Sequence, residues 1–128
     1  MTSSEMFPTR PRLEAVHPAD LGGGPQLYAF TDDWRYHSPK YGSGLIVAGF
    51  TTDFASVPAF FRRYLDDDDP RVLFPAIRHD HRYTLKTIPR KDADDEFAEG
   101  MKACGARWDQ VIAAHRAVRM FGGSRWKD

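Results

Sequence analysis

The pattern of apolar residues changes character near Pro58, and this change limits the possible folds more than any other feature of the chain. Before it, short apolar and aromatic runs alternate with turn-forming glycine, proline and aspartate, which is typical of strands. After it, apolar residues recur three or four positions apart, which is typical of helices. We therefore expect an α+β fold, with a small antiparallel sheet in the N-terminal half and three helices in the C-terminal half.

The length of 128 residues predicts a single domain, residues 1–128. We expect residues 1–24 to be irregular, 25–57 to be rich in strands and 58–126 to be helical. The strand candidates are Gln26–Phe30, Trp34–His37 and Leu45–Phe50, with Thr31–Asp33 as a hairpin turn between the first two and a bend at Gly49.

The helical half contains a short helix candidate over residues 60–65 and three longer ones. Pro75 lies near the start of the first long helix and would move that start toward residue 74. Gly105 is placed to end the second. The three long helices are expected over about residues 71–85, 91–104 and 107–121.

Composition excludes several classes of protein. Lysine plus arginine and aspartate plus glutamate both number 18, and this balance argues against general electrostatic binding of nucleic acid. The single cysteine, Cys104, excludes an internal disulfide framework. The N-terminus lacks the pattern of a signal peptide, and no apolar run approaches the ~18 residues of a transmembrane helix. We therefore expect a protein made in a cytoplasm.

The run Arg78–Tyr83 contains histidine, aspartate and tyrosine, which are common in catalytic and metal-binding sites. On a helix, His79 and Tyr83 share a face, and Asp80 is rotated from them by about 100°. Histidine is a common general base and metal ligand near neutral pH. His81 lies off the His79 face and is expected at the surface or in a supporting position.

Asp94 is the expected partner of His79. A tight connection between the first two long helices makes them antiparallel neighbours, and both residues then lie at similar heights. A carboxylate on the imidazole N–H would fix the tautomer and strengthen the base. The alternative is that Asp94 is an acidic residue favoured by the dipole at a helix N-terminus.

A second motif, Thr51–Pro58, follows a strand and precedes a helix. Asp53 and Ser56 suit helix caps. Asp53 could instead converge on His79 as a metal ligand. Ser56 lacks the flanking glycines of a nucleophile elbow, so a triad centred on it is not expected.

In combination, these motifs resemble a family of small tailed-phage and prophage proteins of unknown function. The resemblance rests on Thr52–Pro58, Pro75–Asp80 with Tyr83, Ala93–Asp94 with Phe97, and Val118–Gly123, and it covers roughly residues 25–126. It implies a phage origin and brings no established reaction.

The two helical motifs are also similar to the catalytic helices of phospholipases A2. That resemblance implies His79 as the base, Asp80 as a calcium ligand, and Tyr83 and Asp94 as the groups that hold the histidine. Those enzymes complete the calcium site with a glycine-rich loop. Here the candidate loop, Tyr41–Gly44, lies far from His79 in sequence, and Asp53 is an alternative cation ligand.

Two functions follow as expectations. The first is a virion- or lysis-associated phage protein with a His-Asp hydrolase site, assisted by calcium or zinc, that acts on the host cell envelope. The second is a non-catalytic component of the phage tail or baseplate, in which the same cluster stabilises the fold. In both, the expected partners are other virion proteins or further copies of this chain, and the protein is made in the host cytoplasm.

Overall fold

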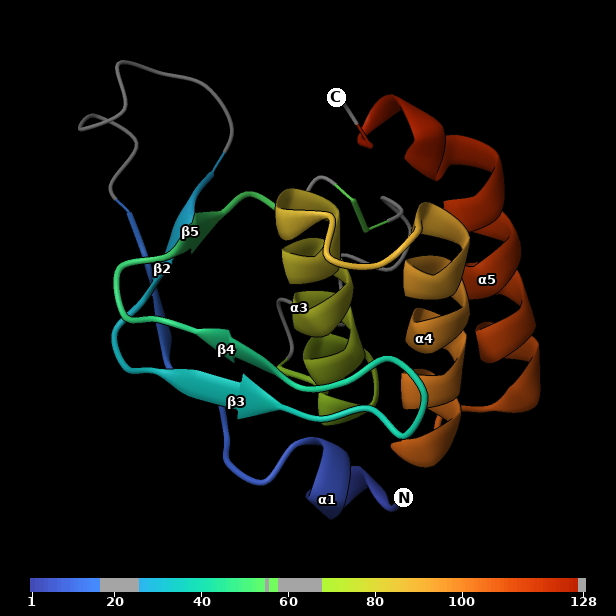
Figure 1. Cartoon of the computed structure of the whole chain (residues 1–128), viewed down its shortest axis with the longest axis horizontal. Coiled ribbons are helices and arrows are strands. Elements are labelled where there is room, and N and C mark those ends of the chain that lie inside the picture. Colours follow the sequence, from blue (N-terminus) through green and yellow to red (C-terminus); the bar gives the residue numbers. More distant parts are fainter. Residues whose placement is uncertain (17–25, 55, 58–67, 127–128) are drawn as a thin grey trace.

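The structure is a computed structural model that describes residues 1–16, 26–54, 56–57 and 68–126. Two small antiparallel sheets, built from the N-terminal half, lie beside a group of helices from the C-terminal half (Figure 1). The expected α+β fold is confirmed. No helix within the described ranges is long and apolar enough to cross a membrane.

Three long helices stand next to one another, with α4 between α3 and α5 (Figure 1). Their observed ends lie within one residue of the ranges expected over 71–85, 91–104 and 107–121, but the later start near residue 74 is wrong. Asp69 caps α3 by accepting the Arg71 N–H, so this helix begins ahead of Pro75 and continues through it. The helix expected over residues 60–65 lies outside the described residues. The helices are α1 (Ser3–Met6), α3 (Pro70–Leu85), α4 (Arg90–Ala103), α5 (Trp108–Phe121) and the 3₁₀ helix η3 (Gly122–Ser124).

The strands form two sheets, and the expected hairpin is wrong. One sheet has the order β1-β2-β5, and the other pairs β3 with β4. The turn at residues 31–33 therefore connects two sheets, because both edges of β2 are already occupied by β1 and β5. The strands are β1 (Leu13–Ala15), β2 (Tyr28–Phe30), β3 (Trp34–Tyr36), β4 (Gly44–Ile46) and β5 (Thr51–Thr52).

Two further expectations about the N-terminal half need correction. Of the strand expected over Leu45–Phe50, only Leu45 and Ile46 belong to a strand, β4, and β5 begins after Phe50. Gly49, between β4 and β5, adopts a φ of 95° that only glycine takes easily. The bend expected at Gly49 is thus confirmed. Residues 1–24 are not wholly irregular, since they contain α1 and strand β1. A capping box between Thr2 and Glu5 stabilises the N-terminus of α1.

Aromatic side chains from both halves form the core. Phe7 stacks on Trp34 with ring centroids 5.7 Å apart, and Phe74 of α3 packs edge-on against both rings. Tyr36 and Ile46, from the β3–β4 sheet, are also buried. The N-terminal segment therefore shares one core with the helices.

A buried charged cluster, consisting of Arg78, Arg82 and Glu96, joins α3 to α4. Arg82 Nε and Nη2 lie 3.1 and 3.0 Å from the Glu96 carboxylate, and Arg78 Nε lies 3.4 Å from it. Arg82 also donates to the Gly42 carbonyl at 2.7 Å, and Arg78 to the His37 carbonyl at 2.9 Å. The cluster thus holds the β3–β4 connection against the helix pair.

Candidate functional site

The expected contact between His79 and Asp94 is present. Lys86, in the left-handed region, ends α3, and α4 returns antiparallel to it beginning at Arg90. His79 Nε2 then lies 2.8 Å from Asp94 Oδ1, and both side chains are fully buried. The imidazole N–H donates to this carboxylate oxygen, which fixes the ring orientation.

Asp94 accepts several further donors. Tyr83 OH lies 2.6 Å from the same oxygen, and Arg119 Nη1, from α5, lies 2.8 Å from the other. Burial by itself would raise the pKa of Asp94, but the hydrogen bonds from His79 and Tyr83 outweigh it and hold the pKa below its ordinary value. Asp94 therefore remains a carboxylate, held by two side chains of α3 and one of α5.

Ser56 lies at the other imidazole nitrogen. Its Oγ is 3.3 Å from His79 Nδ1 and 3.1 Å from Asp80 Oδ1. The hydroxyl of Thr52, at the end of β5, donates to the second oxygen of Asp80. A continuous hydrogen-bonded chain, Asp94–His79–Ser56–Asp80, thus links the two carboxylates, and we call it the polar relay.

Hydrogen bonding in the polar relay allows two arrangements of protons. Ser56 has one hydroxyl proton and two neighbours able to accept it, His79 Nδ1 and Asp80. In one arrangement Ser56 donates this proton to Asp80, as the structure has it. In the other, Ser56 turns the proton to His79 Nδ1, the direction that base-assisted chemistry at Ser56 requires. Burial raises the pKa of Asp80, against the hydrogen bonds from Thr52 and Ser56 that lower it.

The residues expected from sequence are brought together to different degrees. His79, Asp94 and Tyr83 form one contact group, and Asp80 joins it through Ser56. Asp53 is half-buried beside Thr52, and its charge contributes to the raised pKa of Asp80. The roles assigned to these residues remain predictions.

The structure adds residues that sequence reasoning did not select. The sequence does not favour Ser56 as a nucleophile and assigns no site role to Thr52 or Arg119. Thr52 and Ser56 are hydroxyl residues of the noted Thr51–Pro58 motif, four positions apart, and that spacing was the available signal. Arg119 lies in the Val118–Gly123 segment that carries part of the resemblance, but no local pattern there indicates a contact with Asp94.

The donor set gives no complete cation site within the described ranges. No group of three or more histidine, cysteine, aspartate or glutamate side chains gathers there to hold a metal. Both oxygens of Asp80 already accept hydroxyl protons. Calcium takes roughly six to eight oxygen ligands. The calcium or zinc ion remains a prediction, and no step below depends on it.

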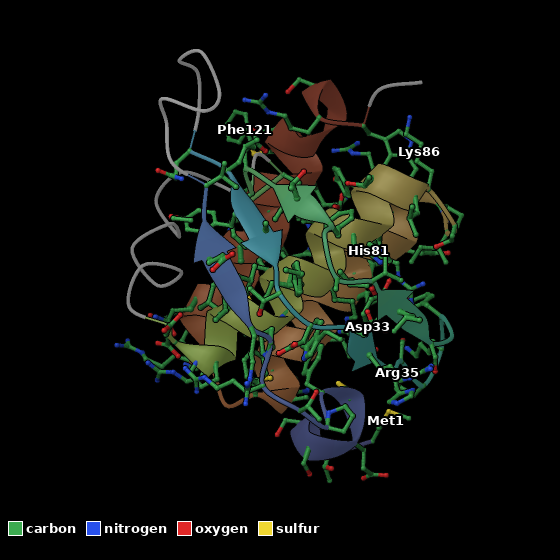
Figure 2. The ribbon with its side chains drawn as sticks, turned by 90° about the vertical axis from the view of Figure 1, so that its left-hand side faces the viewer. Met1, Asp33, Arg35, His81, Lys86 and Phe121 are labelled. Carbon is green, nitrogen blue, oxygen red and sulfur yellow. The ribbon has the colours of Figure 1, made fainter. Side chains whose placement is uncertain are left out.

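His81 faces away from the polar relay but is buried, so its expected surface position is wrong. Its Nδ1 lies 2.7 Å from the Tyr36 hydroxyl, and its ring packs against Tyr36 and Phe50. In Figure 2, His81 lies near the middle of the view, between Phe121 toward the top and Met1 toward the bottom. Burial, with a smaller contribution from Arg82, lowers the pKa of His81 to about 4.

The low pKa of His81 predicts acid sensitivity. Because an unfolded histidine titrates near pH ~6.5, only the unfolded state binds this proton as the pH falls from there toward the folded pKa of about 4. Folded stability is therefore lost in this window. Between about pH 7 and 4.5, the wild type should lose about 2–3 kcal/mol relative to His81→Gln, whose amide oxygen can still accept the Tyr36 proton. Urea unfolding across this pH range measures the free energy of unfolding of both proteins. Parallel pH profiles of that free energy would contradict the prediction.

The polar relay is closed to solvent. His79 and Asp94 are fully buried, and Ser56 is 6% exposed. The structure has a cavity beside β1, lined by Leu13, and a hollow beside α5, lined by Val111. His79, Asp80 and Asp94 are not among the described lining residues of either one. A substrate that reacts at Ser56 must therefore displace neighbouring side chains.

Comparison with known proteins identifies a family. The sequence profile of a family described as "Protein of unknown function (DUF1353)" matches residues 28–118, which includes all members of the polar relay. Neither the curated proteins nor the solved structures gave a match. The match spans most of the length of the chain, and the protein therefore belongs to the DUF1353 family of proteins of unknown function.

Proposed function

We propose that this protein is a hydrolase in which His79 is the general base and Ser56 the nucleophile. One observation carries the proposal: a single imidazole contacts a carboxylate through one nitrogen, at 2.8 Å, and a serine hydroxyl through the other, at 3.3 Å. A base oriented by a carboxylate and in reach of a hydroxyl is the arrangement that acyl transfer requires. Tyr83 and Arg119 hold the carboxylate in place.

The proposed reaction proceeds through an acyl-enzyme. His79 Nδ1 takes the hydroxyl proton as Ser56 Oγ bonds to the carbonyl carbon of an ester. The bond from that carbon to the alcohol oxygen breaks, and the alcohol leaves with the proton from His79. Water then attacks the acyl-serine, gives a proton to His79, and the carboxylic acid is released as the proton returns to Ser56.

The proposed substrate is an ester of the host cell envelope, and the proposed setting is phage infection or lysis. The motif resemblance described above supports the phage setting, and the resemblance of the α3–α4 pair to phospholipases A2 supports an ester. The proposed mechanism differs from that resemblance in two respects. No step uses a calcium ion at Asp80, and Ser56, instead of a water molecule activated by His79, is the nucleophile.

Hydrolysis of p-nitrophenyl butyrate tests the proposal. We expect wild-type turnover to fall by roughly 10²–10⁴-fold in Ser56→Ala, since base-assisted attack is lost. A fluorophosphonate probe should add its mass to Ser56 in the wild type. Ser43→Ala is the matched control, because Ser43 also bonds a histidine, His37 Nδ1 at 2.6 Å, on the exposed surface.

Each outcome of this experiment has a defined meaning. If turnover survives in Ser56→Ala but disappears in His79→Gln, the protein is a hydrolase that depends on His79, and Ser56 is not its nucleophile. A wild type with no turnover and no labelled serine would contradict both the hydrolase activity and the role of Ser56 as nucleophile. Ser43→Ala should behave like the wild type in either assay.

A second candidate function is a structural component of the phage tail, bound to other virion proteins. The complete burial of His79 and Asp94 favours it, because a satisfied internal network needs no opening. Exposed apolar side chains on α5, including Trp108 and Phe121, would be available for contacts with such proteins. This function predicts that Ser56→Ala changes only stability.

A further inference from the structure

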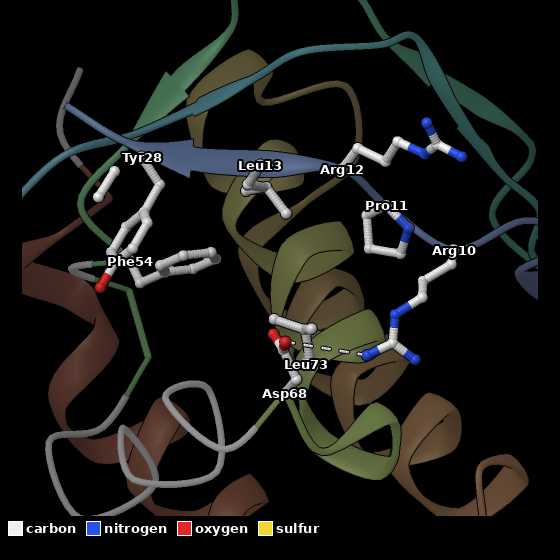
Figure 3. A pocket seen from close by; sticks show the side chains of 9 residues that line it. Arg10, Pro11, Arg12, Leu13, Tyr28, Phe54, Asp68 and Leu73 are labelled. Atoms are coloured by element: carbon white, nitrogen blue, oxygen red, sulfur yellow. Dashed lines mark ion pairs between the residues drawn. The ribbon is translucent and has the colours of Figure 1, made fainter.

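A cavity of about 420 Å³ lies between β1 and the start of α3. Leu13 covers it from β1, Leu73 forms its base on α3, and Tyr28 and Phe54 close one end (Figure 3). Its size is within the range of small-molecule sites, which are walled mainly by apolar and aromatic side chains. The cavity is separate from the polar relay.

Two arginines lie at one end of the cavity, each near an aspartate. Arg10 and Arg12 stand at the end opposite to Tyr28 (Figure 3). Arg10 Nη2 lies 3.9 Å from Asp68, with both side chains largely exposed, and Arg12 Nε lies 3.6 Å from Asp32. These separations are too long for hydrogen bonds. Both guanidinium groups therefore retain donors for a bound anion.

Phe54 connects the cavity to the candidate site. It adopts a φ of 56°, which is uncommon for an aromatic residue and is found preferentially where function constrains the backbone. Thr52 and Ser56, on either side of it, both donate to Asp80, and the Phe54 ring points into the cavity (Figure 3). Phe54 thus lines the cavity and also belongs to the segment that hydrogen-bonds to Asp80.

We propose that this cavity binds an anion with an apolar body. The apolar part lies against Leu13, Leu73 and the Phe54 ring. The anionic group lies at Arg10, where it displaces Asp68, and Arg12, whose guanidinium turns away from the cavity, adds positive charge nearby (Figure 3). This binding site does not require that His79 or Ser56 be catalytic.

Two fluorescent probes with the same ring system test the proposal. 1-Anilinonaphthalene-8-sulfonate carries an anion, and N-phenyl-1-naphthylamine does not. We expect the wild type to bind the sulfonate at one saturable site, at least about fivefold more tightly than the neutral probe, and more weakly as salt is added. Circular dichroism confirms that each protein remains folded.

Charge variants should shift the affinity in opposite directions. Arg10→Gln combined with Arg12→Gln should remove the preference for the sulfonate and leave binding of the neutral probe unchanged. Asp68→Asn should tighten sulfonate binding severalfold, because it removes the competing carboxylate and asparagine tolerates the left-handed backbone of this position, φ 54°. Arg107→Gln is the control, because Arg107 is an exposed arginine that is not among the described lining residues of the cavity.

Equal affinities for the two probes, or sulfonate affinity unchanged in the double arginine variant, would overturn the proposal. The absence of saturable binding in the folded wild type would do the same. Because Ser56→Ala leaves the cavity intact, probe binding with the expected charge dependence supports the site even if ester turnover is absent. Failure of this site is therefore distinguishable from failure of the proposed hydrolase.

Discussion

Replacing Glu96 with alanine is expected to lower the free energy of unfolding by about 3–5 kcal/mol, enough to unfold much of a protein of ordinary stability. Glu96 is fully buried and faces two arginines, Arg78 and Arg82, that are also buried. Burial already lowers the pKa of Arg78, which shows how poorly this interior tolerates a positive charge. Without Glu96, two guanidinium groups would have no opposing carboxylate within the cluster.

The matched control for Glu96 is Asp109→Ala. Arg107 and Asp109 are separated by 2.9 Å, about the distance between Arg82 and Glu96, but both side chains are exposed. An exposed pair contributes about 0–1 kcal/mol. Urea unfolding of both variants measures the difference. A loss below about 1 kcal/mol for Glu96→Ala would show that the buried cluster is not needed for stability.

The second large effect is expected for Asp94→Asn. In the wild type, Asp94 accepts from His79, Tyr83 and Arg119, and both of its oxygens are engaged. An asparagine offers one acceptor oxygen and one donor amide, so one neighbour must face a donor. If the amide N–H faces His79 Nε2, that nitrogen must accept, and the imidazole proton moves to Nδ1. Nδ1 can then no longer take the proton of Ser56.

We therefore expect Asp94→Asn to lower ester turnover by roughly 10²–10⁴-fold and stability by about 1–3 kcal/mol. Asp95→Asn is the control from the next position. Asp95 also bonds two side chains, Lys91 and His115, each at 2.7 Å, but outside the polar relay. It should keep wild-type turnover and lose at most about 1 kcal/mol.

The helical half was predictable because its information is local. Apolar spacing placed the three long helices to within one residue, and the tight connection after Leu85 made α3 and α4 antiparallel. That geometry was sufficient to bring Asp94 to His79 and Tyr83. Each of these contacts depends on helical periodicity and one short turn.

The strand half was only partly predictable because strand pairing depends on distant residues. The segments around Tyr28–Phe30 and Trp34–Tyr36 were correctly assigned as strands, but short segments do not encode their partners. The pairing of β2 with β1 and β5 left no edge for β3. A two-sheet arrangement followed, and it lets aromatic residues of both sheets reach one core.

The site residues that sequence analysis did not predict also depend on distant contacts. Ser56 reaches His79 across 23 positions of sequence, and Arg119 reaches Asp94 across 25. Neither residue has a neighbour pattern that indicates a long-range contact. The motif around Ser56 suggested a helix cap, and only the packing of β5 against α3 assigns its hydroxyl to the polar relay.

The initial rate of p-nitrophenyl butyrate hydrolysis by the wild type and by Asp94→Asn, both shown to be folded by circular dichroism, tests the central claim most directly. The account predicts a wild-type rate clearly above that of buffer and a fall of roughly 100-fold or more in the variant. A wild-type rate equal to that of buffer, or equal rates for the two folded proteins, would contradict a catalytic role for the His79–Asp94 pair.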